Sequence, residues 1–141
     1  MDSRFDSCLE EGKLVKIAVQ KDLVEKELEA AKTDLQSTER SLKEGDSKWA
    51  TVQAYYVMFH AAKALVLSKG YREKSHLCLS VALKVLFVDA NVLERRHYDR
   101  FRDCMDLRKD ADYGLIYSEK SADEVTGWAR EFLEEARRIV K

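Results

Sequence analysis

The stretch WATVQAYYVMFHAAKALVLSKGYREKSH, residues 49–76, decides the fold of this chain. No proline or glycine interrupts it before Gly70, and few side chains within residues 50–67 are strongly polar. Gln53 and His60 are seven positions apart and Lys63 follows three later, so on a helix they form one narrow polar strip. A helix that is apolar on its other sides is usually buried by several neighbours. The stretch predicts the central helix of a small bundle, and its polar residues argue against a membrane span.

The composition indicates a single helical domain over residues 1–141. Of these residues 45% are apolar and 36% are charged, with no proline and five glycines, which favours long helices over a turn-rich β fold. The net charge of −1 argues against non-specific nucleic-acid binding. The N-terminus lacks a signal-peptide pattern, and the three widely spaced cysteines, Cys8, Cys78 and Cys104, indicate reduced thiols. We therefore expect a cytoplasmic protein.

Periodicity and capping residues divide the chain into helices. Residues 1–12 have no periodicity and are expected to be loosely ordered, and residues 14–19 are expected to begin a helix or pack as a lead-in. Amphipathic helices are predicted over residues 22–43 and 92–113, and a capping box at Ser121 and Glu124 starts the last helix. Residues 71–74 are interpreted as a polar connection, and the apolar segment 77–88 as a helix because no partner strand is evident. The pattern predicts an all-α, antiparallel up-and-down bundle of four long helices plus a shorter one.

Three segments, AYYVMFHAAKALVLSKG at residues 54–70, KSH at 74–76 and LRKDADYG at 107–114, together resemble the HEPN family (higher eukaryotes and prokaryotes nucleotide-binding). The chain is most similar to the small stand-alone prokaryotic subfamily with Ala-Tyr-Tyr-x-x-Phe, Ser-His and Arg-x-x-x-Asp-Tyr motifs. The resemblance covers about residues 22–140. It implies a HEPN-like bundle, a homodimer, and a partnership with a minimal nucleotidyltransferase encoded beside it.

Arg108, Asp112 and Tyr113 form the first candidate site. Arg108 and Asp112 are four residues apart, so they share a face of their helix. An acid in the last turn opposes the helix dipole, which is a reason for Asp112 to have a cationic partner. One interpretation is an ion pair that closes the helix with Tyr113 packed beneath it. The other is a binding site for RNA, a nucleotide or a loop of a partner protein.

A catalytic role depends on a spacing that this sequence lacks. Many HEPN ribonucleases carry an arginine followed, after four to six residues, by a histidine, and the pair acts on RNA without a metal. None of the histidines, His60, His76 and His97, follows an arginine at this spacing, and Asp112 stands where the family has the histidine. A carboxylate that is ionised at pH 7 is a poor proton donor. We expect a binding module for RNA or a nucleotide; the alternative is a metal-independent, toxin-type RNA endonuclease that uses Arg108 with Asp112 and Tyr113.

Ser75 and His76 form the second candidate site. Ser75 is a good N-cap for the helix that follows, and His76 would lie in its first turn. His76 is either an exposed residue of this turn or a ligand to a phosphate group at the helix N-terminus. By contrast, His60 is interpreted as a structural histidine, and the Tyr55–Tyr56 pair and Phe59 have core spacing.

A basic cluster lies on the helix predicted at residues 92–113 and contains Arg95, Arg96, Arg100, Arg102 and Lys109. Acidic residues are interleaved with it, and pairing at i,i+4 spacing would neutralise much of its charge. We interpret it as a solvated face. Neither a zinc-type ligand set nor a glycine-rich phosphate loop is present in the sequence, so no cofactor or metal is expected.

Overall fold

The computed structural model describes residues 2–112 and 118–141, and for residues 109–112 it describes the backbone alone. The elements in chain order are α1 (Ser3–Glu10), β1 (Leu14–Lys16), α2 (Lys21–Lys43), α3 (Ser47–Ser68), β2 (Tyr71–Glu73), α4 (His76–Leu83), a π-helical turn η1 (Lys84–Val88), α5 (Arg95–Asp112) and α6 (Glu119–Val140).

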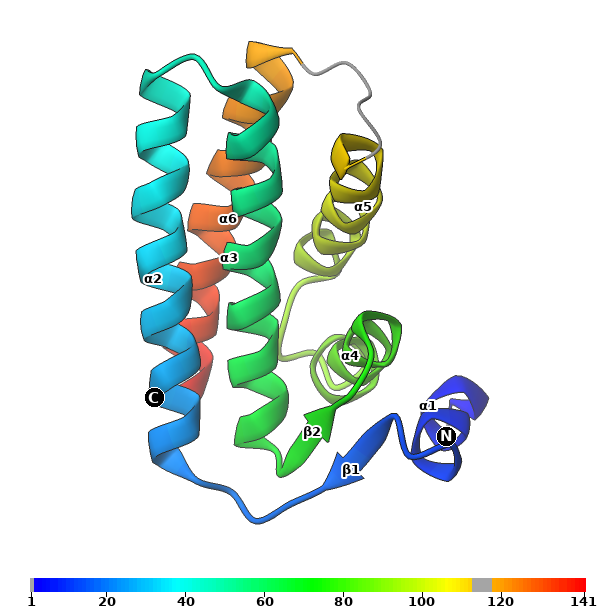
Figure 1. Cartoon of the computed structure of the whole chain (residues 1–141). Coiled ribbons are helices and arrows are strands. Elements are labelled where there is room, and N and C mark those ends of the chain that lie inside the picture. The colour runs from blue at the N-terminus through cyan, green and yellow to red at the C-terminus, as the bar shows by residue number, and fades with distance from the viewer. Residues whose placement is uncertain (1, 113–117) are drawn as a thin grey trace.

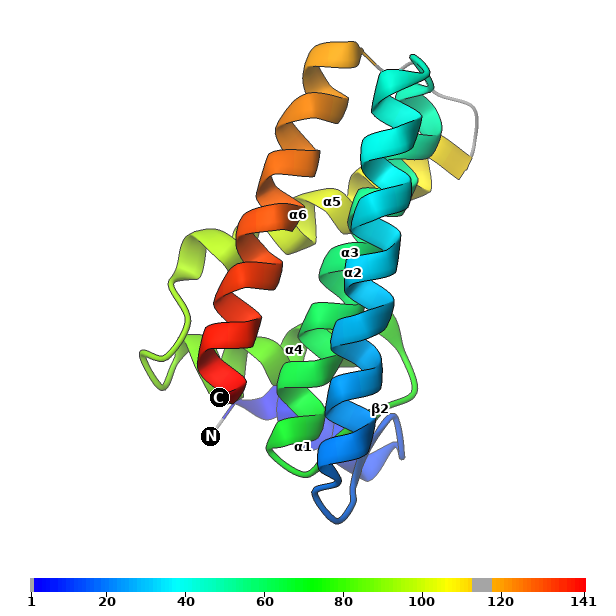
Figure 2. The same cartoon turned by 90° about the vertical axis from the view of Figure 1, so that its left-hand side faces the viewer.

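The four long helices form an up-and-down bundle around α3. In Figure 1, α3 stands between α2 on one side and α4 and α5 on the other, and α6 packs against both α2 and α3. α2 runs in one direction and α3 and α6 run in the other, while α5 rises in the direction of α2 but crosses the bundle obliquely (Figure 2). This arrangement confirms the predicted all-α bundle of four long helices.

α3 is the central helix that its sequence predicts. Ala54, Ala61 and Ala64 are fully buried, and these small side chains allow the neighbouring helices to approach closely. Gln53 and Lys63 of the polar strip stay partly exposed. Within the described ranges, no helix is both long and apolar enough to cross a membrane.

Turn and capping residues set the helix boundaries. Gly45 has a φ of +79°, and the Asp46 carboxylate accepts a hydrogen bond of 3.1 Å from the Trp49 amide, so α2 ends and α3 begins as expected. The predicted start of the last helix is wrong by one turn. The Ser118 hydroxyl accepts the Ser121 amide at 3.0 Å, which places Ser121 inside the first turn of α6.

A short antiparallel ribbon corrects two further predictions. β1 pairs with β2, with Val15 opposite Arg72, whereas the sequence pattern indicated a helix start or lead-in and a polar connection. The Ile17 amide extends the pairing by donating to the Gly70 carbonyl at 2.9 Å. Gly70 has a φ of +82°, and a Cβ there would lie 3.0 Å from the Ile17 carbonyl oxygen, so this turn requires glycine. Three-residue strands are too short to show a period, which explains why the sequence did not reveal them.

The N-terminal arm, residues 3–16, contains α1 and β1, so part of residues 1–12 is helical although no periodicity predicted it. α1 buries Phe5 and Cys8, which are 2% and 4% exposed. Cys8 forms a disulfide with Cys78 of α4, with the two Cα atoms 5.8 Å apart. The expectation of three reduced thiols is therefore wrong for this pair. Cys104 is free and buried, and its burial raises the pKa of its thiol to about 12.

The apolar segment predicted as a helix over residues 77–88 is helical, but it turns its apolar side chains inward. α4 is regular to Leu83, and η1 then widens the helix, with the Asp89 amide donating to the Lys84 carbonyl at 2.9 Å. Leu79, Leu83 and Phe87 are fully buried within the chain. These apolar side chains are covered within the chain by α3, α1 and α5.

Candidate functional site

Tyr55 of α3 lies at the centre of the candidate site. Its side chain is fully buried, and its ring stacks on Phe101 of α5 at a centroid distance of 5.8 Å. Its hydroxyl oxygen lies 2.6 Å from Nδ1 of His76. Burial raises the pKa of the Tyr55 phenol far above its usual value, although the nearby Arg108 charge acts in the opposite direction. Tyr55 therefore remains a neutral phenol that can donate to the imidazole.

His76 occupies the first position of α4 and is held from three sides. Ser75 caps the helix, its hydroxyl accepting the Cys78 amide at 3.0 Å. The imidazole stacks on Phe59 at a centroid distance of 4.5 Å. When Tyr55 donates to Nδ1, the proton of the neutral ring lies on Nε2. The ring is partly exposed, so the site holds an oriented imidazole at the protein surface.

Arg108 approaches the same phenol from α5. Its guanidinium carbon lies 5.4 Å from the centroid of the Tyr55 ring, within the range of a cation–π contact. Arg108 is partly exposed. The fold thus brings Arg108 and His76, which the sequence placed in two separate candidate sites, against one buried tyrosine, and Ser75 caps α4 next to His76.

The other two predicted site residues are Asp112 and Tyr113. Asp112 ends α5, but its side chain lies outside the described part of the structure, and Tyr113 lies outside the described residues altogether. The predicted ion pair between Arg108 and Asp112 stays a prediction. Tyr55 was interpreted from its spacing as a core residue, which its burial confirms, but its contacts with Arg108 and His76 could not be read from the sequence.

A second face of α3 carries a polar seam with α2. His60 Nδ1 lies 2.7 Å from a Glu27 carboxylate oxygen, and Lys63 Nζ lies 3.5 Å from Glu27 and 3.6 Å from Glu73. Burial alone would raise the pKa of Glu27, but the hydrogen bond with His60 and the charge of Lys63 outweigh it, so this pKa is below its usual value. Burial raises the pKa of Glu73 and, next to His60, of Asp34. His60 is therefore a hydrogen-bonded residue of a packed seam, as the sequence suggested.

His97 is buried away from both regions. It is 1% exposed on α5 and meets the Phe132 ring edge-on, and neither ring nitrogen has a hydrogen-bond partner among the described residues. Burial and the positive charge of Arg96 lower the pKa of His97, so the imidazole is held in its neutral form. It is a packing residue in the interface between α5 and α6.

The basic cluster of α5 is mostly neutralised, as expected. Arg95 pairs with Asp99 at 3.6 Å, and Arg100 pairs with Glu131 of α6 at 2.7 Å. Arg102 is the exception, because it has no ion-pair partner among the described residues and its Nε is buried without a hydrogen bond. Nothing in the sequence separates Arg102 from its neighbours; in the structure it lines a cleft together with residues of α1 and α4.

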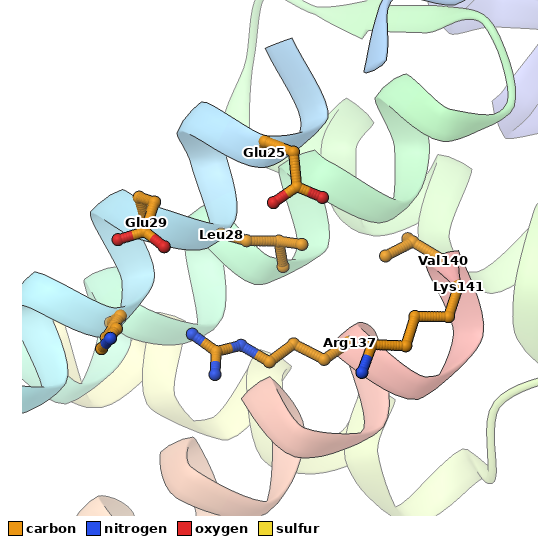
Figure 3. A pocket seen from close by; sticks show the side chains of 7 residues that line it. Glu25, Leu28, Glu29, Arg137, Val140 and Lys141 are labelled. Carbon is orange, nitrogen blue, oxygen red and sulfur yellow. The ribbon is translucent and has the colours of Figure 1, made fainter. Parts of the chain in front are cut away.

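Clefts on the described surface lie in different parts of the fold. One of about 240 Å³ lies between α2 and α6 (Figure 3), where Arg137 extends toward Leu28 and Glu29. Acidic and basic side chains alternate around it, and it contains none of the predicted site residues. A larger cleft of about 440 Å³ lies between α1 and α4 and includes Ser75 in its wall. Among the described residues, no three potential ligand side chains of the types His, Cys, Asp and Glu gather as a metal site would require.

Comparison with known proteins identifies the family. The UPF0332 protein PH1297 of Pyrococcus horikoshii is 36% identical over 72 residues, which is 51% of either chain, so the match spans about half the length of that relative. Two proteins of Methanocaldococcus jannaschii are also similar. "Putative toxin MJ0605" is 29% identical over 93 residues, covering 65% of this chain and 69% of the relative. "Putative toxin MJ0142" is 27% identical over 101 residues, covering 72% and 68%. The HEPN domain model matches residues 24–140, and the chain therefore belongs to the HEPN family.

Proposed function

We propose that this chain is a HEPN-type binding module that takes a phosphate group of RNA or of a nucleotide at the surface around Tyr55. The observation that carries the proposal is the convergence of Arg108 and His76, from two different helices, on one buried phenol. A phosphate needs a cation and hydrogen-bond donors in a fixed arrangement. Arg108 supplies the charge, and the buried ring beneath it limits the freedom of its guanidinium group.

The neighbouring groups suit the rest of such a ligand. His76 lies in the first turn of α4, where backbone N–H groups favour an anion, and its imidazole is partly exposed. The partly exposed rings of Phe59 and Tyr56 lie beside it on α3 and offer apolar faces to a base. The module therefore combines a phosphate contact with a stacking surface.

The partners that we propose follow from the family. The resemblance to stand-alone HEPN proteins supports a homodimer that works with a minimal nucleotidyltransferase, and two relatives bear the name of toxins. Val92 is 41% exposed and is a candidate for a protein contact. We propose that the chain acts as the toxin-type member of such a two-gene pair.

The test is the binding of a labelled single-stranded RNA oligonucleotide to the full chain, with and without a metal chelator. Arg108→Ala should weaken binding by about 1–3 kcal/mol, or about fivefold to 150-fold in Kd, because a charge-assisted contact is lost. Its effect on stability should be about 1 kcal/mol or less. Arg95→Ala, on an exposed part of the same helix, is the matched control and should bind like the wild type. Unchanged binding by Arg108→Ala would refute the proposal.

A second candidate function is the metal-independent RNA endonuclease that uses Arg108 with Asp112 and Tyr113. The observation that favours it is His76, whose imidazole contacts the same tyrosine as Arg108 and could move a proton that a carboxylate holds poorly at pH 7. The same oligonucleotide tests this candidate. Chelator-resistant cleavage that disappears in Arg108→Ala would replace the binding module with the nuclease.

A further inference from the structure

The cleft between α1 and α4 has the features of a ligand site. Its volume of about 440 Å³ falls within the range of about 300–1,000 Å³ that small-molecule sites occupy. One wall is the arm, which begins before residue 24, where the family match starts. The arm wall of the cleft therefore lies outside the HEPN match, while its α4 wall lies inside it.

The charges around the cleft favour an anion. Lys13 and Arg102 line it, and neither has an ion-pair partner among the residues that the structure describes. Arg102 also keeps a buried Nε without a hydrogen bond. Arg4 adds a third cation, already paired with Asp2 at 3.5 Å, and Glu11 is the acid among the lining residues. The two unpaired cations would gain most from a bound anion.

The rest of the wall is apolar. Leu77 and Val81 of α4 line the cleft, and Leu77 is 55% exposed although it is a large apolar residue. The disulfide between Cys8 and Cys78 joins the two walls and holds the arm against α4. Cations beside an apolar surface match a nucleotide, whose phosphate is charged and whose base and ribose carry apolar faces.

The position of the cleft connects it to the proposed binding surface. Ser75 lines the cleft and the next residue, His76, contacts Tyr55, so the cleft and the Tyr55 surface meet at the α4 N-terminus. A chain bound at Arg108 and His76 therefore needs to pass only this turn to reach Lys13 and Arg102.

We propose that the cleft between α1 and α4 binds one further nucleotide unit of the RNA, with its phosphate on Lys13 and Arg102 and its ribose and base against Leu77 and Val81. This inference rests on the proposed function, because it extends the ligand of the Tyr55 surface. It makes the arm part of the binding site.

The experiment uses the oxidised full chain and the same labelled single-stranded RNA. Lys13→Gln and Arg102→Gln should each weaken binding by about fivefold, and each should reduce the slope of log Kd against log salt by about 0.7, the value for one phosphate contact on a single strand. Lys16→Gln, an exposed lysine of the same arm that does not line the cleft, is the matched control and should change the Kd and the slope less than either. Lys13 is exposed, so its variant tests the cleft even if Arg102→Gln unfolds, which a thermal melt would reveal.

The outcomes separate this inference from the proposed function. If Arg108→Ala weakens binding but Lys13→Gln and Arg102→Gln behave like Lys16→Gln, the cleft is refuted and the Tyr55 surface stands. If the wild type binds no RNA even at low salt, the proposed function fails, and adenosine 5′-monophosphate then tests the cleft alone. Shifts of the Leu77 and Val81 methyl NMR signals that disappear in Lys13→Gln would support a site for a free nucleotide, and their absence in the wild type would refute the cleft.

Discussion

The two sides of α3 differ in what they do with their polar groups. Toward α2, His60 and Lys63 meet carboxylates of the protein itself, at 2.7 Å and 3.5 Å from Glu27. Toward α4 and α5, Tyr55 and its neighbours form an aromatic cluster on which Arg108 and His76 rest while staying partly exposed. The side of α3 that faces α2 therefore makes ion pairs within the protein, and the side that faces α4 and α5 contributes to a partly exposed surface.

The contacts on the two sides of α3 distinguish polar residues that stabilise the fold from polar residues that we associate with binding. Ion pairs that are satisfied within the protein hold helices in register, and a ligand must compete with those partners to use them. A cation held over a buried ring already has its side chain ordered, so it loses less conformational freedom when an anion binds. We therefore assign stability to the seam of Glu27, His60 and Lys63, and binding to the surface of Arg108 and His76.

The largest expected effect tests whether the aromatic cluster is also part of the core. Phe101 is fully buried and stacks on Tyr55, so Phe101→Ala should reduce the free energy of unfolding by about 3–5 kcal/mol because it leaves a cavity. Urea unfolding measures this loss. Phe101→Leu, which keeps much of the volume, should lose markedly less. If Phe101→Ala lowered the free energy of unfolding by less than about 1 kcal/mol, Phe101 would not be tightly packed against the aromatic cluster.

A smaller effect is expected in the seam. Glu27→Gln keeps the shape of the side chain but removes the charge that His60 and Lys63 share, and should cost about 1–2 kcal/mol of stability in urea unfolding. Glu29→Gln, exposed on the same helix, should change stability by less than about 0.5 kcal/mol. RNA binding should be unaffected by either change. If Glu27→Gln weakened RNA binding as much as Arg108→Ala, the separation of the two sides of α3 would be lost.

The hydroxyl of Tyr55 links packing with binding on the aromatic side. Tyr55→Phe keeps the ring but removes the hydrogen bond to His76, and should lower the free energy of unfolding by about 1 kcal/mol. RNA binding should weaken severalfold because the imidazole is no longer held in one orientation. Tyr56→Phe is the neighbouring control, since the Tyr56 hydroxyl makes no hydrogen bond within the described residues, and both variants are compared by RNA titration and urea unfolding. Equal RNA affinity for both variants would show that the hydrogen bond plays no part in binding.

The smallest effect concerns pH and the buried His97, which belongs to neither side. Its pKa in the folded protein is below the value of 6.5 for a free histidine, so the unfolded chain binds an extra proton as the pH falls through that value. The wild type should therefore lose stability from about pH 7 toward pH 5. In His97→Phe this loss should be shallower by less than about 1 kcal/mol, which urea unfolding across this pH range measures as a slope. Equal slopes of stability against pH for the wild type and His97→Phe would contradict the lowered pKa of His97.

Long periodic segments explain why most of the fold could be predicted. α2 and α3 have a clear apolar pattern and a glycine-aspartate turn between them, and each signal is local. The ribbon of β1 and β2 could not be found in this way. Its strands have three residues each, and the pairing of Leu14 with Glu73 joins segments far apart in the chain. The disulfide between Cys8 and Cys78 depends on the same long-range contact, so counting cysteines could not indicate it.

Residues of the candidate site could be predicted from the sequence, but their proximity in the fold could not. The motif of Arg108 and the capping pattern at Ser75 and His76 predicted two separate sites. For each of them the alternative was a purely structural role. Their common partner, Tyr55, has the spacing of a core residue, and no local pattern shows that a buried hydroxyl meets a histidine from another helix. Arg102, unlike the paired arginines of α5, lines a cleft with residues of α1, which is a long-range proximity that the sequence does not show.

The disulfide of the arm also acts on the chain when it is not folded. Cys8 and Cys78 are separated by 70 positions, so the bond closes a loop that contains about half of the protein. In the chain-entropy description, a loop of this length reduces the disorder of the unfolded ensemble enough to favour the native state by about 4 kcal/mol at 25 °C. The bond joins a segment that precedes the HEPN match to the middle of the match. An arm of a few residues thereby stabilises the whole bundle through the states that the unfolded chain can no longer visit.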